Sequence, residues 1–420
     1  MKLIGTLYNR KSLLIFLFLV SILIQSVFLS LLPNPQQRNQ SSDYIRFYEP
    51  VAQNILSGKG MIDAGGNLAI RYPPGYPLIL SMVFGLADCT GTDRLGLIAI
   101  FNVLTTAVSC FLVFLVAELV FAPRVGLISS LIWITYPFNL WLIKQPNSEV
   151  PFILLLYFGI WIFILAIKKR YFALTFIAGV VLALAALVRP ASTLLGFLFA
   201  LVLLLYKEIP KMRRIFYAVL LSLGCLITIL PWEIHVLSST GHFLPLSTGG
   251  PPSIRDGLTF AVKPGGGGDR APVPKDVMAL MERIAANKSN LNTTASIFDY
   301  LVREWENKPA PILKLVALKL CRSWYGTDEM WYEKYILAIQ VLYLILGIIG
   351  IILGIRIYGD RLQYIVFLLA TVFYFWGMTV LVLSILRYMI PAMGFIIIFS
   401  AIPIDTIITW WSQRISELDV

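Results

Sequence analysis

The stretch YILAIQVLYLILGIIGIILGI, Tyr335–Ile355, contains no charged side chain, and LLIFLFLVSILIQSVFLSLL, Leu13–Leu32, is of the same kind. A helix needs about 20 apolar residues to cross the hydrocarbon core of a bilayer. Similar runs recur along the chain, which is 58% hydrophobic and 14% charged. Soluble domains carry about 25% charged residues. The sequence therefore predicts an all-α polytopic membrane protein.

The apolar runs predict about ten transmembrane helices within a single integral membrane domain, residues 1–420. The first run is long and lacks a small-residue cleavage site, so we expect a retained span rather than a signal peptide. The expected spans are approximately 12–32, 94–121, 125–143, 150–167, 172–188, 191–206, 215–232, 335–356, 362–385 and 388–409.

Basic residues gather in alternate short connections between these spans. Short loops rich in lysine and arginine face the cytoplasm, so we expect both termini to be cytoplasmic. This pattern also accounts for the net charge of +11 without a nucleic-acid partner. The residues concerned are Lys2, Arg10, Lys11, Arg124, Lys168, Lys169, Arg170, Lys207, Lys211, Arg213, Arg214, Arg356, Arg361 and Arg414.

Two long segments, 33–93 and 233–334, are then expected on the outer face of the membrane. The first contains YIRFYEPVAQNIL, whose helical apolar spacing predicts a helix lying along the interface. Its other apolar part, Leu78–Ala87, is too short to span and is expected to form a surface or re-entrant helix. The second segment ends in PAPILKLVALKLCRSWYG, Pro309–Gly326, which is typical of an amphipathic helix on the outer leaflet.

Ionisable residues beside membrane spans are costly and mark function more often than those elsewhere. Asp43 opens the first outer segment. It is either a general base at the membrane surface or a helix N-cap, a role that Ser41 and Ser42 also suit. Glu49 lies about two helical turns further on, where it could join the same site or face water.

Arginines mark the outer ends of other segments. Arg71 precedes YPPGYP, whose prolines fix the direction of the backbone. Arg189 is followed by Pro190, and Arg387 with Tyr388 opens the last span. Each is a candidate to bind an anionic ligand, or simply a solvated or snorkelling side chain. Glu149 is either a second carboxylate of the site or an acid favoured at a helix N-terminus.

One outer carboxylate with several arginines suits the transfer of a sugar from a lipid phosphate. A phosphate with a second pKa of about 6 departs without a general acid. One carboxylate then suffices, as the base that deprotonates an acceptor hydroxyl. Arginines stabilise the departing phosphate through bidentate hydrogen bonds, so the mechanism needs neither a metal nor a cofactor. Attack opposite the phosphate inverts the anomeric centre.

Four features resemble the membrane glycosyltransferases of the C superfamily, in particular protein O-mannosyltransferases and the aminoarabinose transferases that modify lipid A. They are Asp43 early in the first outer segment, RYPPGYPLIL at Arg71–Leu80, LVRP at Leu187–Pro190 and RYMIP at Arg387–Pro391. Their order and spacing cover nearly the whole chain.

This resemblance implies juxtamembrane helices in the first outer segment and a sugar donor linked to polyprenyl phosphate. It also implies Asp43 as the base and an inverting mechanism on the outer face. Many members carry Asp-Glu at the first site, where this chain has Asp43–Tyr44; Glu49 or Glu149 could supply the second acid. The acceptor, which could be a glycan, a lipid or a protein, is not specified.

Other functions are compatible with a membrane protein of this kind. A transporter or flippase of a lipid-linked glycan would place charges at mid-membrane and use broken helices in paired halves, whereas most spans here lack internal charge. A ligase-type glycan polymerase would use a long late outer segment, for which 233–334 is suitable. A non-catalytic assembly subunit is expected if Asp43 only caps a helix.

Overall fold

The computed structural model of the chain describes residues 10–38, 40–206, 208–262 and 273–418. Their regular structure is helical, apart from one isolated antiparallel bridge between Ile62 and Leu68. The α-helices are α2 (Arg10–Ser30), α3 (Glu49–Leu56), α4 (Gly75–Thr90), α5 (Arg94–Val120), α6 (Pro123–Thr135), α7 (Pro137–Leu142), α8 (Glu149–Lys169), α9 (Phe172–Val188), α10 (Leu195–Leu205), α11 (Lys211–Thr240), α12 (Gly250–Leu258), α13 (Lys275–Ala286), α14 (Thr294–Asn307), α15 (Pro309–Arg322), α16 (Glu333–Ile357), α17 (Leu362–Leu381) and α18 (Leu386–Leu418).

Seven helical segments within the described residues are long and apolar enough to cross a bilayer: α2, α5, α8, α11, α16, α17 with the short turn before it, and α18. The all-α membrane architecture expected from the sequence is therefore confirmed. Three further predicted spans correspond to shorter apolar helices, α6, α9 and α10, of 13, 17 and 11 residues.

The span predicted at 125–143 is wrong as one continuous helix. It is divided into α6 and α7 at Tyr136, whose backbone is extended, with a ψ of 114°. Pro137 follows, and proline has no N–H and clashes with a helical conformation of the preceding residue. The apolar run thus predicted the correct location but not the break.

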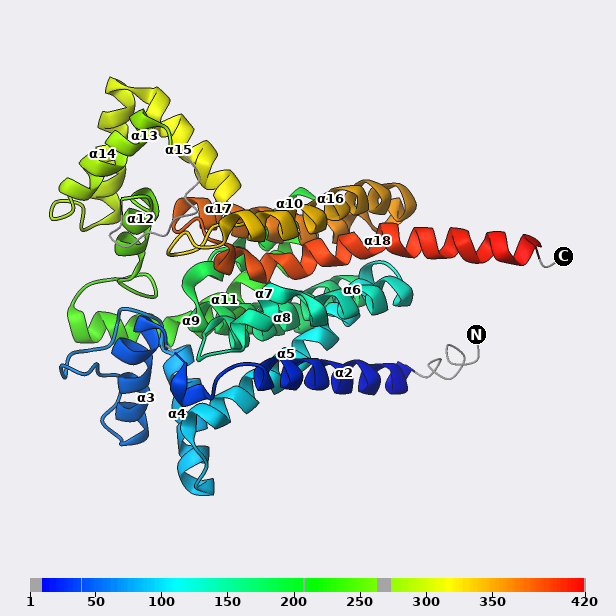
Figure 1. The fold of residues 1–420 in the computed structure, drawn as a ribbon, viewed down its shortest axis with the longest axis horizontal. Coiled ribbons are helices and arrows are strands. Elements are labelled where there is room, and N and C mark those ends of the chain that lie inside the picture. The colour runs from blue at the N-terminus through cyan, green and yellow to red at the C-terminus, as the bar shows by residue number, and fades with distance from the viewer. Residues whose placement is uncertain (1–9, 39, 207, 263–272, 419–420) are drawn as a thin grey trace.

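The helices form an elongated bundle with two distinct ends (Figure 1). The first turn of α2 and the last turns of α18 lie at the same end. The two long segments that the sequence assigns to the outer face, with α3, α4 and α12 to α15, lie at the opposite end. This arrangement agrees with an even number of crossings between the termini.

In the first long segment, α4 runs across the direction of the long helices (Figure 1). It carries three exposed apolar side chains at helical spacing, Leu78, Met82 and Leu86, which are 40%, 72% and 55% exposed. A short helix with an apolar exposed face fits a position along the membrane interface, which is one of the two alternatives, surface or re-entrant, that the sequence left open for Leu78–Ala87.

In the second long segment, α12 to α15 form what we call the outer helical layer. Its buried apolar side chains, from Ile254 to Met330, make a cluster separate from the core of the bundle. The predicted helix at Pro309–Gly326 is α15, but it is not a simple amphipathic surface helix. Lys319 and Arg322 on it are buried, and Lys314 is exposed.

Candidate active site between the long segments and the bundle

A cavity of about 240 Å³ lies where the first outer segment meets α8, α9, α17, α18 and the start of α12. Its wall combines acidic, basic, hydroxyl and apolar side chains from segments far apart in the chain. The lining residues are Asp43, Tyr48, Tyr72, Ser148, Arg189, Pro190, Ala191, Pro245, Ser247, Gly249, Gly250, Ser253, Phe375, Met378, Thr379, Val382, Arg387 and Tyr388.

Asp43 lies in this wall and its carboxylate does not cap a helix. Its backbone is already helical, with φ −67° and ψ −38°, and its side chain makes no capping hydrogen bond. The capping bond comes from Ser41, whose Oγ accepts from the backbone N–H of Tyr44 at 3.2 Å. The Asp43 carboxylate instead accepts a hydrogen bond of 2.9 Å from the hydroxyl of Tyr72.

Tyr72 is held in place by aromatic packing. Its ring stacks on Tyr48 at a centroid distance of 5.1 Å and meets the edge of Phe47 at 5.1 Å. Burial, together with the nearby Asp43, raises the pKa of Tyr72, so its hydroxyl keeps its proton. Tyr72 is therefore a fixed hydrogen-bond donor that orients the Asp43 carboxylate.

The stretch RYPPGYP sets the position of Tyr72 relative to α9. A Cβ atom at Gly75 would lie 2.6 Å from the carbonyl oxygen of Leu187, so only glycine permits this approach. Pro73 and Pro74 restrict the backbone immediately before it. The start of α4 is thereby packed on the end of α9, next to Arg189.

Arg189 and Arg387 converge on one buried carboxylate, that of Glu149. Nη1 of Arg189 lies 2.7 Å from Glu149 Oε1, and Nη2 of Arg387 lies 3.0 Å from Oε2. The Nε of Arg387 also donates to Oε1. The two residues before Glu149 accept further hydrogen bonds from the same arginines. Ser148 Oγ accepts from Arg189 Nη1 at 3.0 Å, and Asn147 Oδ1 accepts from Arg387 Nη2 at 3.0 Å.

This cluster leaves an excess of positive charge beside the cavity. Glu149 is fully buried, whereas the side chains of Arg189 and Arg387 are 15% and 21% exposed. One carboxylate neutralises one of the two guanidinium groups. The Tyr388 ring covers Arg189 at 5.0 Å and limits its movement. Two oriented guanidinium groups that share a single carboxylate suit a phosphate ligand.

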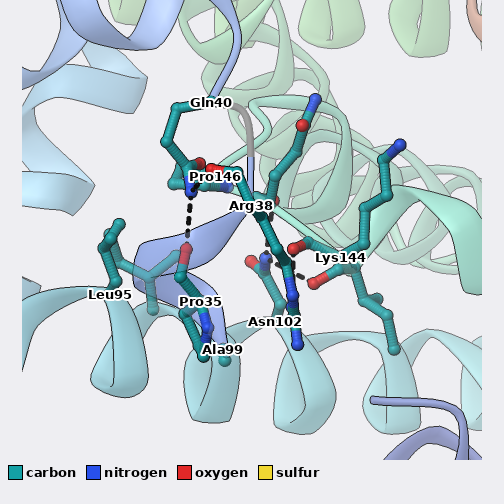
Figure 2. Close-up of a pocket in the computed structure, with 11 residues that line it drawn as sticks. Pro35, Arg38, Gln40, Leu95, Ala99, Asn102, Lys144 and Pro146 are labelled. Carbon is teal, nitrogen blue, oxygen red and sulfur yellow. Dashed lines mark hydrogen bonds between the residues drawn. The ribbon is translucent and has the colours of Figure 1, made fainter. Parts of the chain in front are cut away.

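The loop that leads into α8 and ends at Ser148 is held by hydrogen bonds at a second hollow of about 10 Å³ (Figure 2). Arg38 donates to the carbonyl oxygen of Lys144 at 2.7 Å, and Asn102 donates to that of Gln145 at 3.1 Å. Figure 2 shows both side chains directed at this backbone. The hollow is about the size of one water molecule, so it supports the loop rather than offering a substrate site.

Three of the residues singled out from the sequence do not line the cavity: Glu149, which is buried behind Arg189 and Arg387, Arg71 and Glu49. Arg71 is exposed, and its guanidinium lies 5.5 Å from the ring centroid of Tyr72. Glu49 is partly buried on α3, where burial raises the pKa of its carboxyl group and Arg94 is the opposing charge. Asp43 is thus the single carboxylate among the described residues that line the cavity.

Sequence reasoning missed several lining residues. Tyr72 is adjacent to Arg71 in the motif already noted, and Ser148 precedes Glu149, so their neighbourhoods were identified but not their roles. Ser247, Gly249 and Ser253 come from the second outer segment, whose sequence carries no signal that connects it to Asp43.

Residues 71–235 match the family described as dolichyl-phosphate-mannose-protein mannosyltransferase. The resemblance to the C superfamily of membrane glycosyltransferases is therefore confirmed over this segment, which includes Tyr72, Glu149 and Arg189. No curated protein matches the chain significantly.

Among solved structures, the chain is similar to the oligosaccharyltransferase AglB from Archaeoglobus fulgidus, in complex with an inhibitory peptide and a dolichol-phosphate. The TM-score is 0.60 at 13% identity, over 97% of this chain and 52% of that one. ArnT from Cupriavidus metallidurans bound to undecaprenyl phosphate gives a TM-score of 0.44 at 13% identity, over 94% of this chain and 77% of that one. The similarity to AglB shows a shared fold, and the chain spans about half the length of that enzyme.

Proposed function

We propose that this chain is a glycosyltransferase that moves a sugar from a polyprenyl-phosphate-linked donor to an acceptor hydroxyl, with inversion at the anomeric carbon. The observation that carries the proposal is the presence of Asp43, Arg189 and Arg387 in the wall of one cavity. The family match over residues 71–235 supports the same chemistry.

Asp43 is the general base in this proposal. Its carboxylate takes the proton of the acceptor hydroxyl as the hydroxyl oxygen attacks the anomeric carbon. The bond from that carbon to the phosphate oxygen breaks, and polyprenyl phosphate leaves with the bonding electrons. The hydrogen bond from Tyr72, at 2.9 Å, occupies Oδ1 of Asp43 and leaves Oδ2 for the acceptor.

Arg189 and Arg387 bind the donor phosphate and stabilise the charge that grows on it as the sugar departs. A phosphate monoester is a good leaving group at neutral pH, because its second pKa is about 6. A second acid to protonate the leaving group is therefore not required, in contrast to glycoside hydrolysis.

Glu149 holds the two arginines in this mechanism and is not the second acid. Both of its carboxylate oxygens accept from guanidinium groups, and no part of the side chain is exposed. Glu49 lies outside the cavity wall, has Arg94 as its opposing charge and takes no part. Arg71 is a peripheral charge that could attract an anionic donor without contacting it in the cavity.

The apolar wall of the cavity receives the first isoprene units of the donor. Phe375, Met378 and Val382 lie on one side of it, on and just after α17. Burial of their apolar surface against a prenyl chain contributes affinity in proportion to the area removed from water. We place the site on the outer membrane face, with both termini cytoplasmic, from the distribution of basic loop residues.

The experiment that tests this function compares the lipids and glycans of a deletion strain by mass spectrometry. A strain that lacks the protein loses one sugar from one acceptor, and re-expression of the wild-type chain restores it. Re-expression of Asp43→Asn at the same level does not. An unchanged glycan profile with an altered distribution of lipid-linked sugar across the membrane would instead support a flippase.

A further inference from the structure

Two basic residues of α15 are buried where the outer helical layer meets the bundle. The exposed fractions of Lys319 and Arg322 are 2% and 4%. Lys319 Nζ donates to the carbonyl oxygen of Val382 at 3.2 Å, and Arg322 Nη1 donates to that of Ser384 at 3.0 Å. Both acceptors lie between α17 and α18, in a segment that we take with the first residue of α18, residues 382–386, and call the α17–α18 turn.

The same turn makes two more close contacts with the second outer segment. The backbone N–H of Leu386 donates to the carbonyl oxygen of Gly326 at 2.8 Å, just after α15. A Cβ atom at Gly257 of α12 would lie 1.7 Å from the carbonyl oxygen of Val382, so any side chain there would force the two backbones apart. The turn is thus fixed at several points along its length.

The two basic residues of this contact differ in whether a carboxylate balances their charge. Arg322 is neutralised by Glu333 at 2.7 Å, and its guanidinium lies 4.3 Å from the ring centroid of Phe260. Within the described residues, the side-chain Nζ of Lys319 donates to the carbonyl oxygen of Val382 alone. Burial lowers the pKa of Lys319 to about 7. A buried ammonium without a carboxylate partner is costly, so a packing role alone would be served better by an apolar side chain.

The position of the turn relates these contacts to the cavity. Val382 lines the cavity, and Arg387 follows Leu386 directly. The start of α12, through Gly249, Gly250 and Ser253, lines the same cavity from the outer helical layer. A shift of the turn would therefore move the Arg387 backbone and the cavity wall together.

We propose that Lys319 and Arg322 are positioning residues for Arg387: by fixing the backbone of the α17–α18 turn, they make the donor-phosphate affinity depend on docking of the outer helical layer. This inference rests on the proposed function, in which Arg387 binds the donor phosphate. It adds that contacts from the outer helical layer determine the position of Arg387 and thereby the affinity for the donor phosphate.

The test measures binding of a polyprenyl phosphate without sugar to the purified full-length protein. Lys319→Met keeps an unbranched side chain as far as Cε but removes the Nζ that donates to Val382. We expect its dissociation constant for polyprenyl phosphate to rise about fivefold, because a less firmly held turn weakens the charge-assisted contact between Arg387 and the phosphate. The control is Lys314→Met on the same helix, which removes only an exposed pair with Asp276; it should bind as the wild type does.

A double-variant comparison shows whether Lys319 acts through Arg387. In an Arg387→Ala background, Lys319→Met should cause no further loss of lipid-phosphate affinity. If Lys319→Met does not fold, Gly257→Ala serves instead, since it displaces α12 from Val382 without removing a charge. Gly257→Ala should weaken binding when Arg387 is present and have no further effect when it is combined with Arg387→Ala.

The outcomes separate this inference from the proposed function. A folded Lys319→Met or Gly257→Ala protein with wild-type affinity overturns the inference alone, even if its melting temperature is lower. Equal losses with and without Arg387 overturn it as well, because they show a general effect on structure. If the wild-type protein does not bind polyprenyl phosphate, or if Arg387→Ala binds it equally well, the proposed function itself is wrong.

Discussion

The carboxylate of Glu149, at the start of α8, lies 2.7 Å from the guanidinium of Arg189, at the end of α9. The guanidinium of Arg387, from α18, reaches the same carboxylate. Three helix ends are thereby joined at one buried charge cluster beside the cavity. The stability of the cluster depends on this shared carboxylate, and in the proposed function the two guanidinium groups that it holds bind the donor phosphate.

Replacement of Glu149 by glutamine should destabilise the protein strongly. It leaves two largely buried guanidinium groups without a counter-charge, and removal of one partner from a buried pair costs about 3–5 kcal/mol. Thermal unfolding in detergent should show a clear fall in melting temperature. Glu49→Gln is the matched control, since that carboxylate is only partly buried. Equal melting temperatures for the two variants would contradict the role of Glu149.

Replacement of Asp43 by asparagine should abolish sugar transfer while the protein still folds and binds donor. Loss of a general base lowers the rate by about 10²–10⁴-fold. The measurement is the rate of transfer with donor at saturation, compared with wild type at equal protein concentration. Ser42→Ala, at the exposed neighbouring position, should leave the rate unchanged. Transfer retained by Asp43→Asn would remove the proposed base.

Replacement of Tyr72 by phenylalanine should lower the rate of transfer with little loss of stability. The change removes the hydroxyl that orients Asp43 but keeps the ring stacked on Tyr48. We expect a decrease of about tenfold, because a hydrogen bond to a charged group is lost. Tyr44→Phe, a buried tyrosine that does not line the cavity, should behave as wild type. Equal rates in both variants would argue against the orienting role.

Replacement of Arg189 or Arg387 by alanine should impair use of the donor more than use of the acceptor. Both side chains contact the site where the donor phosphate is expected, and neither hydrogen-bonds Asp43 in this structure. The Michaelis constants for donor and acceptor are measured separately in each variant. An unchanged constant for the donor would count against phosphate binding by these residues. Lys144→Ala, on the loop just before Glu149 and outside the cavity wall, is the control.

Stability should increase with pH because of Lys319. Burial lowers its pKa to about 7 in the folded protein, whereas a lysine in an unfolded chain has a pKa of about 10.4. Between these values the unfolded state binds more protons, so the folded state gains stability as pH rises, by up to about 1.4 kcal/mol per unit. The gain is complete above the unfolded pKa and is lost as pH falls through 7.

The measurement compares thermal unfolding of the wild-type protein with that of Lys319→Met, on either side of neutral pH. The melting temperature of the wild type should rise relative to that of the variant as the solution becomes more alkaline. Because other titrating groups are common to both proteins, the difference isolates Lys319. A difference independent of pH would show that Lys319 keeps an ordinary pKa in the folded protein.

Local sequence determined the membrane-embedded, helical character of the chain and the approximate positions of its long helices. An apolar run as long as Tyr335–Ile355 is unfavourable in water whatever its neighbours are. Its prediction as a membrane helix therefore does not depend on the rest of the fold. Proline breaks were less predictable. Pro137 divides an apolar run that hydropathy alone treats as continuous.

Only the tertiary structure decided which charged residues meet. Arg71, Arg189 and Arg387 looked equivalent as outer-face arginines, yet two of them share Glu149 and the third is exposed. The sequence likewise left Asp43 as base or cap, and the local bond of Ser41 together with the distant hydroxyl of Tyr72 places its carboxylate in the cavity wall. Hydropathy is a property of each segment, whereas a charge pair depends on how distant segments pack, which no single segment encodes.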